Sequence, residues 1–340
     1  MVTKIGLDLG YSSIAISDAS FEVDREPSIA IIDKNTRRII SVGRDSILPE
    51  NAAAGVPIRP FKNGLLYSAD FTKQIIKSAI SVINTSEDIR CVVGVPASFN
   101  SKQESELASM VFDAGVKECF LVKRAVAALI GAGYAPTISA ISVNIGASAT
   151  EIAILCRGEI IYSETCEIGG EAFDEAVQKY ILEQGELNIS LLDAKAIKEG
   201  IGAVWDGRCA EPITIAGTLA LTGNKIKMSV SSEDILGVFE KPLYELLAAI
   251  ANAVKKIPID YVEEIFANGI VLSGGGAELY GTDKMISKVL GVSVTMANNP
   301  ADCVVRGLSL VNTFLPIKMR SNGKNITPQL AKFFKGNNKK

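Results

Sequence analysis

Two stretches decide the fold, GLDLGYSSIAIS at residues 6–17 and SVNIGASATEIAIL at residues 142–155. Each runs from an apolar strand into Asp or Asn, an aliphatic residue, Gly and a small polar turn, and then into a second strand. The alignment places two extra residues in the second turn, so that Ile-Ala-Ile at 14–16 matches Ile-Ala-Ile at 152–154. Because each copy opens an α/β segment, the repeat predicts a chain built from two related halves.

The composition excludes several classes of protein. The 340 residues are 48% hydrophobic, which is ample for more than one average domain. A net charge of −3 indicates that the body of the protein is not built to bind nucleic acid. The chain has no histidine, which excludes histidine-based triads and imidazole ligands.

The cysteines and the N-terminus predict a cytoplasmic protein. Six scattered cysteines without a CxxC pair indicate reduced thiols. Cys156 and Cys166 could be neighbours across a hairpin, but two buried thiols are the favoured interpretation. The chain opens directly into a strand and has no apolar run of about 20 residues, so we expect neither a signal peptide nor a membrane span.

The pattern of apolar residues predicts alternating strands and helices in both halves. In the first half we expect strands at 4–10, 13–17, 25–33, 37–43, 89–98 and 118–123 and helices at 68–83, 100–115 and 124–133. In the second half we expect three strands within 138–170, a strand pair at 211–230, a strand in 268–281 and helices at 170–184, 190–204, 232–255 with a break near Pro242, 258–267 and 300–314.

The two glycine turns have the chemistry of a phosphate site. Consecutive backbone N–H groups in such a turn point into one concavity that suits a phosphate oxygen. Gly10 and Gly146 allow an anion to approach the backbone closely, and Ser12, Ser13, Ser148 and Thr150 add hydroxyl donors. One such turn alone is usually a simple hairpin, whereas two facing turns can hold a polyphosphate between them.

Two further features belong to the same predicted site. The segment LSGGGAEL, residues 272–279, places three glycines between a strand and a helix, where an adenosine could lie against the backbone at a helix N-terminus. A bound triphosphate brings Mg²⁺, which proteins hold through one or two carboxylates. Asp8 beside the first turn is the predicted metal ligand, although it could simply stabilise the turn. Asn144 in the second copy adds no negative charge.

At this point the chain resembles the actin superfamily, and in particular the bacterial actins of the MreB and MamK type. The resemblance covers about residues 3–315 and rests on GLDLGYSS and NIGASATE as the two phosphate loops and VLSGGGAELYG as the adenosine loop. Several other segments, such as IGGEAFDEAVQKYI, also run parallel to MreB sequences.

The resemblance implies an α/β, actin-like (duplicated ribonuclease H-like) fold of two domains and four subdomains, with ATP or ADP and Mg²⁺ in the cleft. Domain I would span 1–139 with a small subdomain at about 21–66, and domain II 140–302 with a small subdomain at about 183–240; helix 303–317 would return to domain I. The residues implied at the nucleotide are Asp8, Gly10, Tyr11, Ser12, Ser13, Asn144, Gly146, Ala147, Ser148, Thr150, Gly169, Gly170, Lys198, Gly274, Gly275, Gly276 and Glu278.

The sequence departs from the family pattern at two places. Asn144 stands where bacterial actins have Asp, and Lys123-Arg124-Ala125 stands where MreB proteins have Glu-Glu-Pro. The second Glu of that run positions the attacking water, and its counterpart here is Arg124. A guanidinium cannot accept a proton at neutral pH, so we expect weak, slow or absent hydrolysis. The alternative is that Arg124 points outward and another acid serves.

The resemblance predicts a cytoskeletal protein that polymerises with copies of itself, with a role in cell shape, organelle positioning or DNA segregation and an unidentified cargo or adaptor. The alternatives are a small-molecule kinase or a chaperone-type ATPase of the same fold. The loop NTSEDIR, residues 84–90, lacks the apolar pair of an MreB membrane loop. We therefore expect no direct membrane contact, except through the basic C-terminal end.

The C-terminal end, residues 318–340, carries only positive charges. Its basic residues are Lys318, Arg320, Lys324, Lys332, Lys335, Lys339 and Lys340. Such a segment is usually a solvated, mobile tail, and that is the prediction here. It could instead contact an acidic surface, such as the body of a neighbouring copy, and Phe333 and Phe334 leave lipid contact open.

Overall fold

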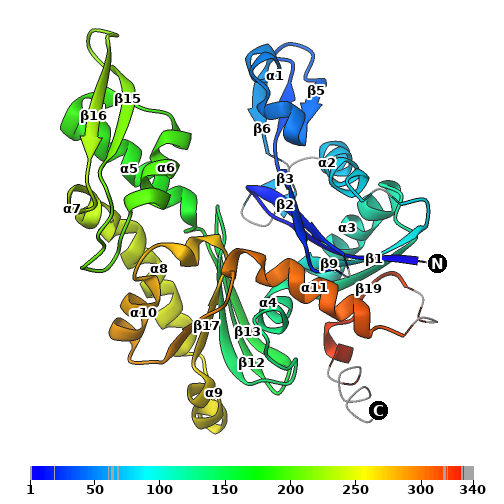
Figure 1. Cartoon of the computed structure of the whole chain (residues 1–340). Helices are drawn as coiled ribbons and strands as arrows, with labels where there is room; N and C mark the ends of the chain where they lie inside the picture. The colour runs from blue at the N-terminus through cyan, green and yellow to red at the C-terminus, as the bar shows by residue number, and fades with distance from the viewer. Residues whose placement is uncertain are drawn as a thin grey trace.

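The structure is a computed structural model of the whole chain. It describes residues 2–18, 20–59, 61–62, 65–66, 69–83, 85–316, 319, 321–330 and 332. Two large sheets lie side by side in the lower part of the molecule, and a small subdomain stands above each of them (Figure 1). None of the helices in the described part of the chain has the length and apolar character needed to cross a bilayer.

The first large sheet has the strand order β19-β10-β9-β1-β2-β3. Its strands are β1 (Val2–Leu9), β2 (Ser13–Ser17), β3 (Val23–Pro27), β9 (Asp88–Val95), β10 (Glu118–Lys123) and β19 (Asn322–Asn325). The first three strands form an antiparallel meander, and β9, β10 and β19 continue the sheet in parallel from β1. Helix α3 (Ser101–Asp113) makes the crossover between β9 and β10 that parallel strands require.

The second large sheet repeats this arrangement, with the order β13-β12-β11-β17-β18. Its strands are β11 (Ala140–Ile145), β12 (Thr150–Cys156), β13 (Glu159–Cys166), β17 (Ile270–Ser273) and β18 (Val294–Met296). Again three antiparallel strands are followed by two parallel ones. The predicted duplication is therefore confirmed, and β19 is the strand that only the first half has.

The register of the two hairpins corrects one detail of the sequence alignment. Leu9 pairs with Ile14 in the first hairpin, and Ile145 pairs with Thr150 in the second. Four residues thus separate the strands in both turns, so the predicted two-residue insertion is wrong. In the corrected alignment Ile14 corresponds to Thr150, and Ala15 corresponds to Glu151.

The helices that the sequence predicts lie close to their predicted positions, whereas α1 and α10 below were not predicted. They are α1 (Pro49–Ala54), α2 (Ala69–Ser81), α3, α4 (Arg124–Gly131), α5 (Gly170–Gly185), α6 (Leu191–Ile201), α7 (Ser232–Ile235), α8 (Glu240–Val254), α9 (Val262–Asn268), α10 (Thr282–Leu290) and α11 (Cys303–Phe314). Short 3-10 turns are η1 (Gly43–Ile47), η2 (Leu236–Phe239), η3 (Ile259–Tyr261), η4 (Gly275–Glu278), η5 (Pro300–Asp302) and η6 (Thr327–Gln329). The predicted break in 232–255 is η2, and Pro242 lies in the first turn of α8, where its missing N–H costs little.

Helices α4 and α11 pack against each other between the two sheets (Figure 1). Their backbones meet at two glycines, because a Cβ at Gly131 would overlap the carbonyl oxygen of Cys303 and a Cβ at Gly307 would overlap that of Ala127. Asn312 of α11 donates from Nδ2 to the carbonyl oxygens of Ile5 (2.9 Å) and Arg90 (3.0 Å) in the first sheet. These bonds attach the C-terminal helix to the first sheet.

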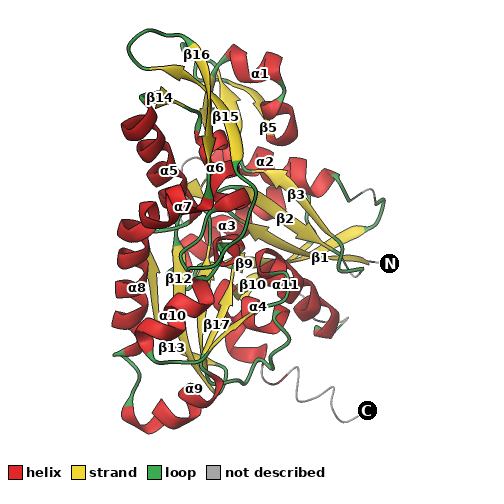
Figure 2. Ribbon diagram, turned by 60° about the vertical axis from the view of Figure 1, so that its left-hand side comes forward, coloured by secondary structure: helices red, strands yellow, loops and turns green. Residues whose placement is uncertain are grey.

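The small subdomains each contain a three-stranded sheet, and they stand at the same end of the molecule in both views (Figure 2). The first consists of β4 (Ala30–Ile32), β5 (Ile39–Val42) and β6 (Val56–Ile58), and the second of β14 (Leu187–Asn188), β15 (Ile213–Leu219) and β16 (Lys225–Val230). The two-stranded pair β7 (Phe61–Lys62) and β8 (Leu65–Leu66) follows the first. The predicted start at residue 21 is wrong, because β3 belongs to the large sheet; the other domain bounds stay predictions.

The cysteines are all free. Cys156 pairs with Glu159 and Cys166 with Thr150, so these two cysteines lie at opposite ends of the β12–β13 hairpin and are not neighbours. Burial raises the pKa of Cys119 to about 12, which keeps this thiol protonated. The prediction of reduced thiols is consistent with these positions. The prediction that Cys156 and Cys166 are both buried is wrong for Cys166, which is only partly buried.

The C-terminal segment contradicts the prediction of a mobile tail from residue 318. Strand β19 pairs in parallel with β10, and Ile326 and Leu330 beyond it are almost fully buried. The sequence of β19, Asn-Gly-Lys-Asn, is polar and lacks the alternation of apolar residues that predicts a strand. It forms a strand because it pairs with the edge of β10. The rest of the predicted tail, including Phe333, Phe334 and the last lysines, lies outside the described residues.

We predict that Ile326→Ala destabilises the protein by about 2–4 kcal/mol, because it removes a fully buried side chain from the packed core. The free energy of unfolding in urea would measure this loss. Lys324→Ala, at an exposed position of the preceding strand β19, is the control and is expected to change stability by less than about 0.5 kcal/mol. Equal stabilities of both variants and wild type would mean that the segment is a free tail in solution.

Candidate functional site

The two glycine turns face one cavity between the halves. In the first turn the N–H of Gly10 donates to the carbonyl of Ser13 (3.1 Å), and in the second the N–H of Gly146 donates to the carbonyl of Ala149 (2.9 Å). Both turns line a cavity of about 1240 Å³, into which residues of both large sheets and both small subdomains project. The two turns therefore border one space from two sides, with the N–H groups of Gly10 and Gly146 used to close the turns themselves.

Most of the predicted residues lie on the wall of this cavity. They are Asp8, Gly10, Tyr11, Ser12, Ser13, Asn144, Gly146, Ala147, Ser148, Gly170, Lys198, Gly274, Gly275, Gly276 and Glu278. The structure brings these residues together from five separate segments of the chain, which is the arrangement that the two-turn hypothesis requires. Whether they contact a ligand stays a prediction.

Thr150 and Gly169 are corrections to the predicted set. The Thr150 side chain is buried, and its hydroxyl donates to the carbonyl of Ile168 (2.7 Å), so it is directed away from the cavity. Gly169 supports the second turn from behind, because a Cβ there would lie 2.6 Å from the backbone of Ala147 and Ala149. The residue that the corrected register places in the cavity wall is Glu151, which the sequence analysis missed.

The N-terminus of α5 is attached to the second turn. The N–H of Gly170 donates to the carbonyl of Gly146 (2.9 Å), and the N–H of Glu171 donates to that of Ala147 (2.8 Å). These bonds occupy two N–H groups that a helix leaves free in its first turn. The turn is consequently held by the helix that follows it, with Gly169 as the point of closest approach.

The third glycine segment forms part of the opposite wall, but not at an α-helix. Gly274 has a φ of 85°, and its N–H donates to the carbonyl of Pro300 (2.8 Å). The next residues form the 3-10 turn η4, and α10 begins only at Thr282. The predicted helix N-terminus beside the glycines is therefore wrong, whereas the close backbone approach that glycine allows is present.

Lys198 is fixed by an ion pair inside the wall. Its Nζ lies 2.6 Å from Oδ1 of Asp174 and donates to the carbonyl of Gly170 (3.0 Å). Burial raises the pKa of Asp174, and the charge of Lys198 opposes that effect. Three further polar residues that the sequence analysis missed line the same side, namely Lys195, Glu199 and Arg208. Lys195 lies three residues before Lys198 on α6, which places both on one face of the helix. This spacing could have indicated Lys195 from the sequence.

Arg124 points into the cavity and not outward. Its Nη2 forms an ion pair with Glu151, and its Nη1 lies 3.6 Å from Oδ1 of Asp8. It thus connects a residue of the first turn region with one of the second. Burial lowers the pKa of Arg124, but Glu151 and Asp8 raise it, and the net direction is upward. The acid that could replace the family's water-positioning glutamate is present as Glu151, and it is bound to Arg124.

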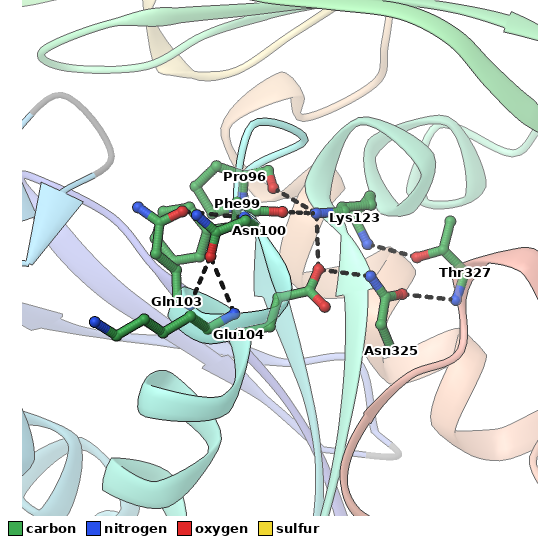
Figure 3. A network of polar contacts seen from close by, with 9 residues as sticks. Pro96, Phe99, Asn100, Gln103, Glu104, Lys123, Asn325 and Thr327 are labelled. Atoms are coloured by element: carbon green, nitrogen blue, oxygen red, sulfur yellow. Dashed lines mark hydrogen bonds and ion pairs between the residues drawn. The ribbon is translucent and has the colours of Figure 1, made fainter.

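Lys123, the neighbour of Arg124, joins the cavity wall to the C-terminal segment (Figure 3). Its Nζ donates to the carbonyls of Pro96 (3.1 Å) and Phe99 (2.9 Å) and lies 2.8 Å from Glu104. Asn325 Nδ2 donates to the same Glu104 carboxylate (2.7 Å). Because Pro96 and Phe99 line the cavity, β19 helps to position this part of its wall.

Two polar contacts connect the halves across the mouth of the cavity. The hydroxyl of Tyr11 donates to Oε1 of Glu171 (3.2 Å), and the Arg59 guanidinium lies 4.8 Å from the centre of the Tyr11 ring. Arg25 donates to Asp302 at 2.5 Å. The Tyr11–Glu171 and Arg25–Asp302 contacts each pair a residue of the first half with one beyond residue 140, so they connect the two halves through side chains.

The fold and this site together define the class of protein. Two related domains with the same strand order, each opening with a glycine hairpin that faces the cleft between them, and a C-terminal helix returning to the first domain form an actin-like fold. A sequence model of the MreB/Mbl protein family matches residues 2–317. The chain belongs to the MreB/Mbl family.

Individual proteins agree with this assignment. The cell shape-determining protein MreB of Pasteurella multocida (strain Pm70) is 30% identical over 322 residues, which cover 89% of this chain and 91% of the relative. The crystal structure of MreB5 of Spiroplasma citri bound to AMPPNP is similar with a TM-score of 0.84 and 20% identity, covering 92% of this chain and 96% of that one. A MamK double helical filament matches with a TM-score of 0.77 and 22% identity over 93% of this chain and 100% of MamK.

Proposed function

We propose that this protein binds an adenine nucleotide, ATP or ADP, between its two domains and assembles with copies of itself into cytoskeletal filaments in the cytoplasm. The observation that carries the proposal is the pair of glycine turns that line one cavity from opposite domains. The name of the MreB5 structure, with its bound AMPPNP, supports the nucleotide, and that of the MamK filament supports self-assembly. The relatives' names favour a role in cell shape.

We further propose that hydrolysis is slow. Arg124 stands at the position of the family's water-positioning glutamate, and it holds the nearby Glu151 in an ion pair. A carboxylate that is bound to a guanidinium is a weaker acceptor for a water proton than a free one. The Mg²⁺ predicted at Asp8 stays a prediction.

Gly275→Leu tests the nucleotide and the filament in one experiment. Gly275 lines the cavity and is exposed, and a Cβ there would have only Ala301 Cβ near it, at 3.9 Å. A leucine therefore fits the fold but enters the space proposed for the nucleoside. We expect wild type to pellet with AMPPNP and to show filaments by electron microscopy. We expect Gly275→Leu to bind ADP at least about tenfold more weakly than wild type. Its melting temperature should be unchanged.

The matched control is Gly237→Leu, another exposed glycine in a 3-10 turn, with no atom within 4 Å of its Cβ position. It lies outside the cavity and is expected to behave as wild type. If wild type binds no adenine nucleotide at millimolar concentration, the proposed site is wrong. If it binds nucleotide but no filaments form with AMPPNP, ATP or ADP, self-assembly is wrong and the site stands.

A further inference from the structure

Three charged side chains from different elements meet in the wall of the cavity. Asp8 lies near the end of β1, Arg124 is the first residue of α4, and Glu151 follows the second glycine turn on β12. Nη1 of Arg124 also donates to the carbonyl of Leu9 (3.4 Å), which directs the guanidinium toward the first turn. The three side chains are between 7% and 20% exposed, so their charges are largely shielded from water.

The path of the Arg124 side chain depends on a glycine of the neighbouring strand. Gly94 of β9 pairs with Asp8 on one side and with Val122 of β10 on the other. A Cβ at Gly94 would lie 3.0 Å from Cγ and 3.5 Å from Cδ of Arg124. The absence of a side chain at residue 94 lets Arg124 cross the sheet end and reach Asp8.

The guanidinium is the one positive charge among the three side chains, and it offsets one of the two carboxylate charges. Burial raises the pKa of Asp8, and among the opposing effects the charge of Arg124 is the largest. Removing one partner of a buried ion pair is strongly destabilising, because the remaining charge is left without compensation. Arg124 therefore supplies positive charge that a bound cation would otherwise supply to Asp8 and Glu151.

A divalent cation beside these side chains would lie next to the Arg124 guanidinium, although Oδ1 of Asp8 and Oε2 of Glu151 are buried without a hydrogen-bond partner in the described residues. Mg²⁺ prefers octahedral oxygen ligands and keeps several waters. Here the predicted ligand Asp8 faces a guanidinium at 3.6 Å, so a metal ion at the carboxylate would be repelled by a fixed positive charge.

Arg124 has a remaining donor that suits a phosphate. Its Nε has no hydrogen-bond partner within the described part of the chain, although it is buried. A guanidinium presents its N–H groups in a planar fork that matches phosphate oxygens, and it can contact a phosphate while keeping an acid partner. Arg124 belongs to the same cavity wall as both glycine turns.

We propose that Arg124 takes the place of the metal ion in this cleft, so that the protein binds a nucleoside di- or triphosphate without requiring a divalent cation. This inference rests on the proposed nucleotide site and specifies how its phosphate charge is neutralised. Arg124 offsets part of the negative charge of Asp8 and Glu151 in the free protein and donates to the phosphates in the bound one. Gly94 is the residue that makes this position accessible.

Calorimetric titration of the full chain with ADP and with AMPPNP tests the proposal, in excess magnesium chloride and in excess EDTA. For wild type we expect the dissociation constant to differ by less than about threefold between the two buffers. For Arg124→Gln we expect a loss of about tenfold or more in EDTA relative to magnesium, since the cluster is then short of one positive charge. Arg124→Lys keeps a charge and is expected to lie closer to wild type.

The control is Arg157→Gln, which removes an exposed arginine paired with Glu264 outside the cavity. It is expected to match wild type in both buffers. A loss of about tenfold or more for wild type in EDTA would overturn the inference and leave the nucleotide site intact. Absence of binding in both buffers would refute the nucleotide site itself. The wild-type comparison decides the question even if Arg124→Gln does not fold.

Discussion

Arg124→Glu is expected to raise the rate of phosphate release from ATP by about tenfold to a hundredfold in the presence of magnesium. The substitution places a carboxylate where the family has its water-positioning acid, and it frees Glu151 from its ion pair. A carboxylate can accept a hydrogen bond from the attacking water, whereas a guanidinium has only donors. Phosphate release under saturating ATP measures the effect directly.

Arg124→Gln separates the two causes. It removes the positive charge without adding an acid, so any increase that it shares with Arg124→Glu comes from releasing Glu151. If all three proteins release phosphate at the same rate, and that rate is as fast as in ordinary bacterial actins, Arg124 does not limit hydrolysis. In that case the water is positioned by other groups, and the substitution at residue 124 has no catalytic consequence.

Arg124→Glu should also make stability depend on magnesium. The variant brings a third carboxylate next to Asp8 and Glu151, and neighbouring like charges in a shielded site destabilise the folded state. We expect its melting temperature to be lower in EDTA than in magnesium chloride, whereas that of wild type is nearly the same in both. Differential scanning fluorimetry without nucleotide measures this difference.

Gly307→Ala is expected to destabilise the protein by about 3 kcal/mol or more. The added Cβ would overlap the carbonyl oxygen of Ala127, so α4 and α11 would have to move apart. Alanine is preferred to glycine within a helix by about 1 kcal/mol, which is smaller than the cost of separating two packed backbones. Since α4 and α11 pack between the sheets of both domains, the loss affects the whole molecule.

Gly237→Ala is the matched control, because its Cβ position is open. Urea unfolding should show a loss for Gly307→Ala and a change of less than about 0.5 kcal/mol for Gly237→Ala. A Gly307→Ala protein as stable as the control would show that the helices can separate without cost. The close contact of α4 and α11 would then contribute little to the stability of the fold.

Much of the architecture could be predicted from the sequence because its signals are local. The strand–glycine–strand pattern occurs twice, and each copy determines where its hairpin turns. Helix α3 has its start and end in the sequence as well, with Asn100 capping the first turn and Gly115 following the last one at a φ of 106°. The glycines that line the cavity were found for the same reason.

The features that were missed depend on pairing between distant segments. Glu151 was hidden by the two-residue insertion in the alignment, and only the register of β11 and β12 places it beside the cavity. Strand β19 is polar, and it is a strand only because β10 offers an open edge. The ion pairs of Arg124 required Gly94, whose role is visible only where β1, β9 and α4 meet.

The sequence by itself determined the duplication, the alternation of strands and helices and the two glycine turns, since each of these follows from residues that are close together in the chain. Only the tertiary structure decided the partners of Arg124, the position of Glu151 and the attachment of the C-terminal segment. These features depend on contacts between residues that are far apart in the chain. Such contacts form only when the two sheets and the helices have packed together.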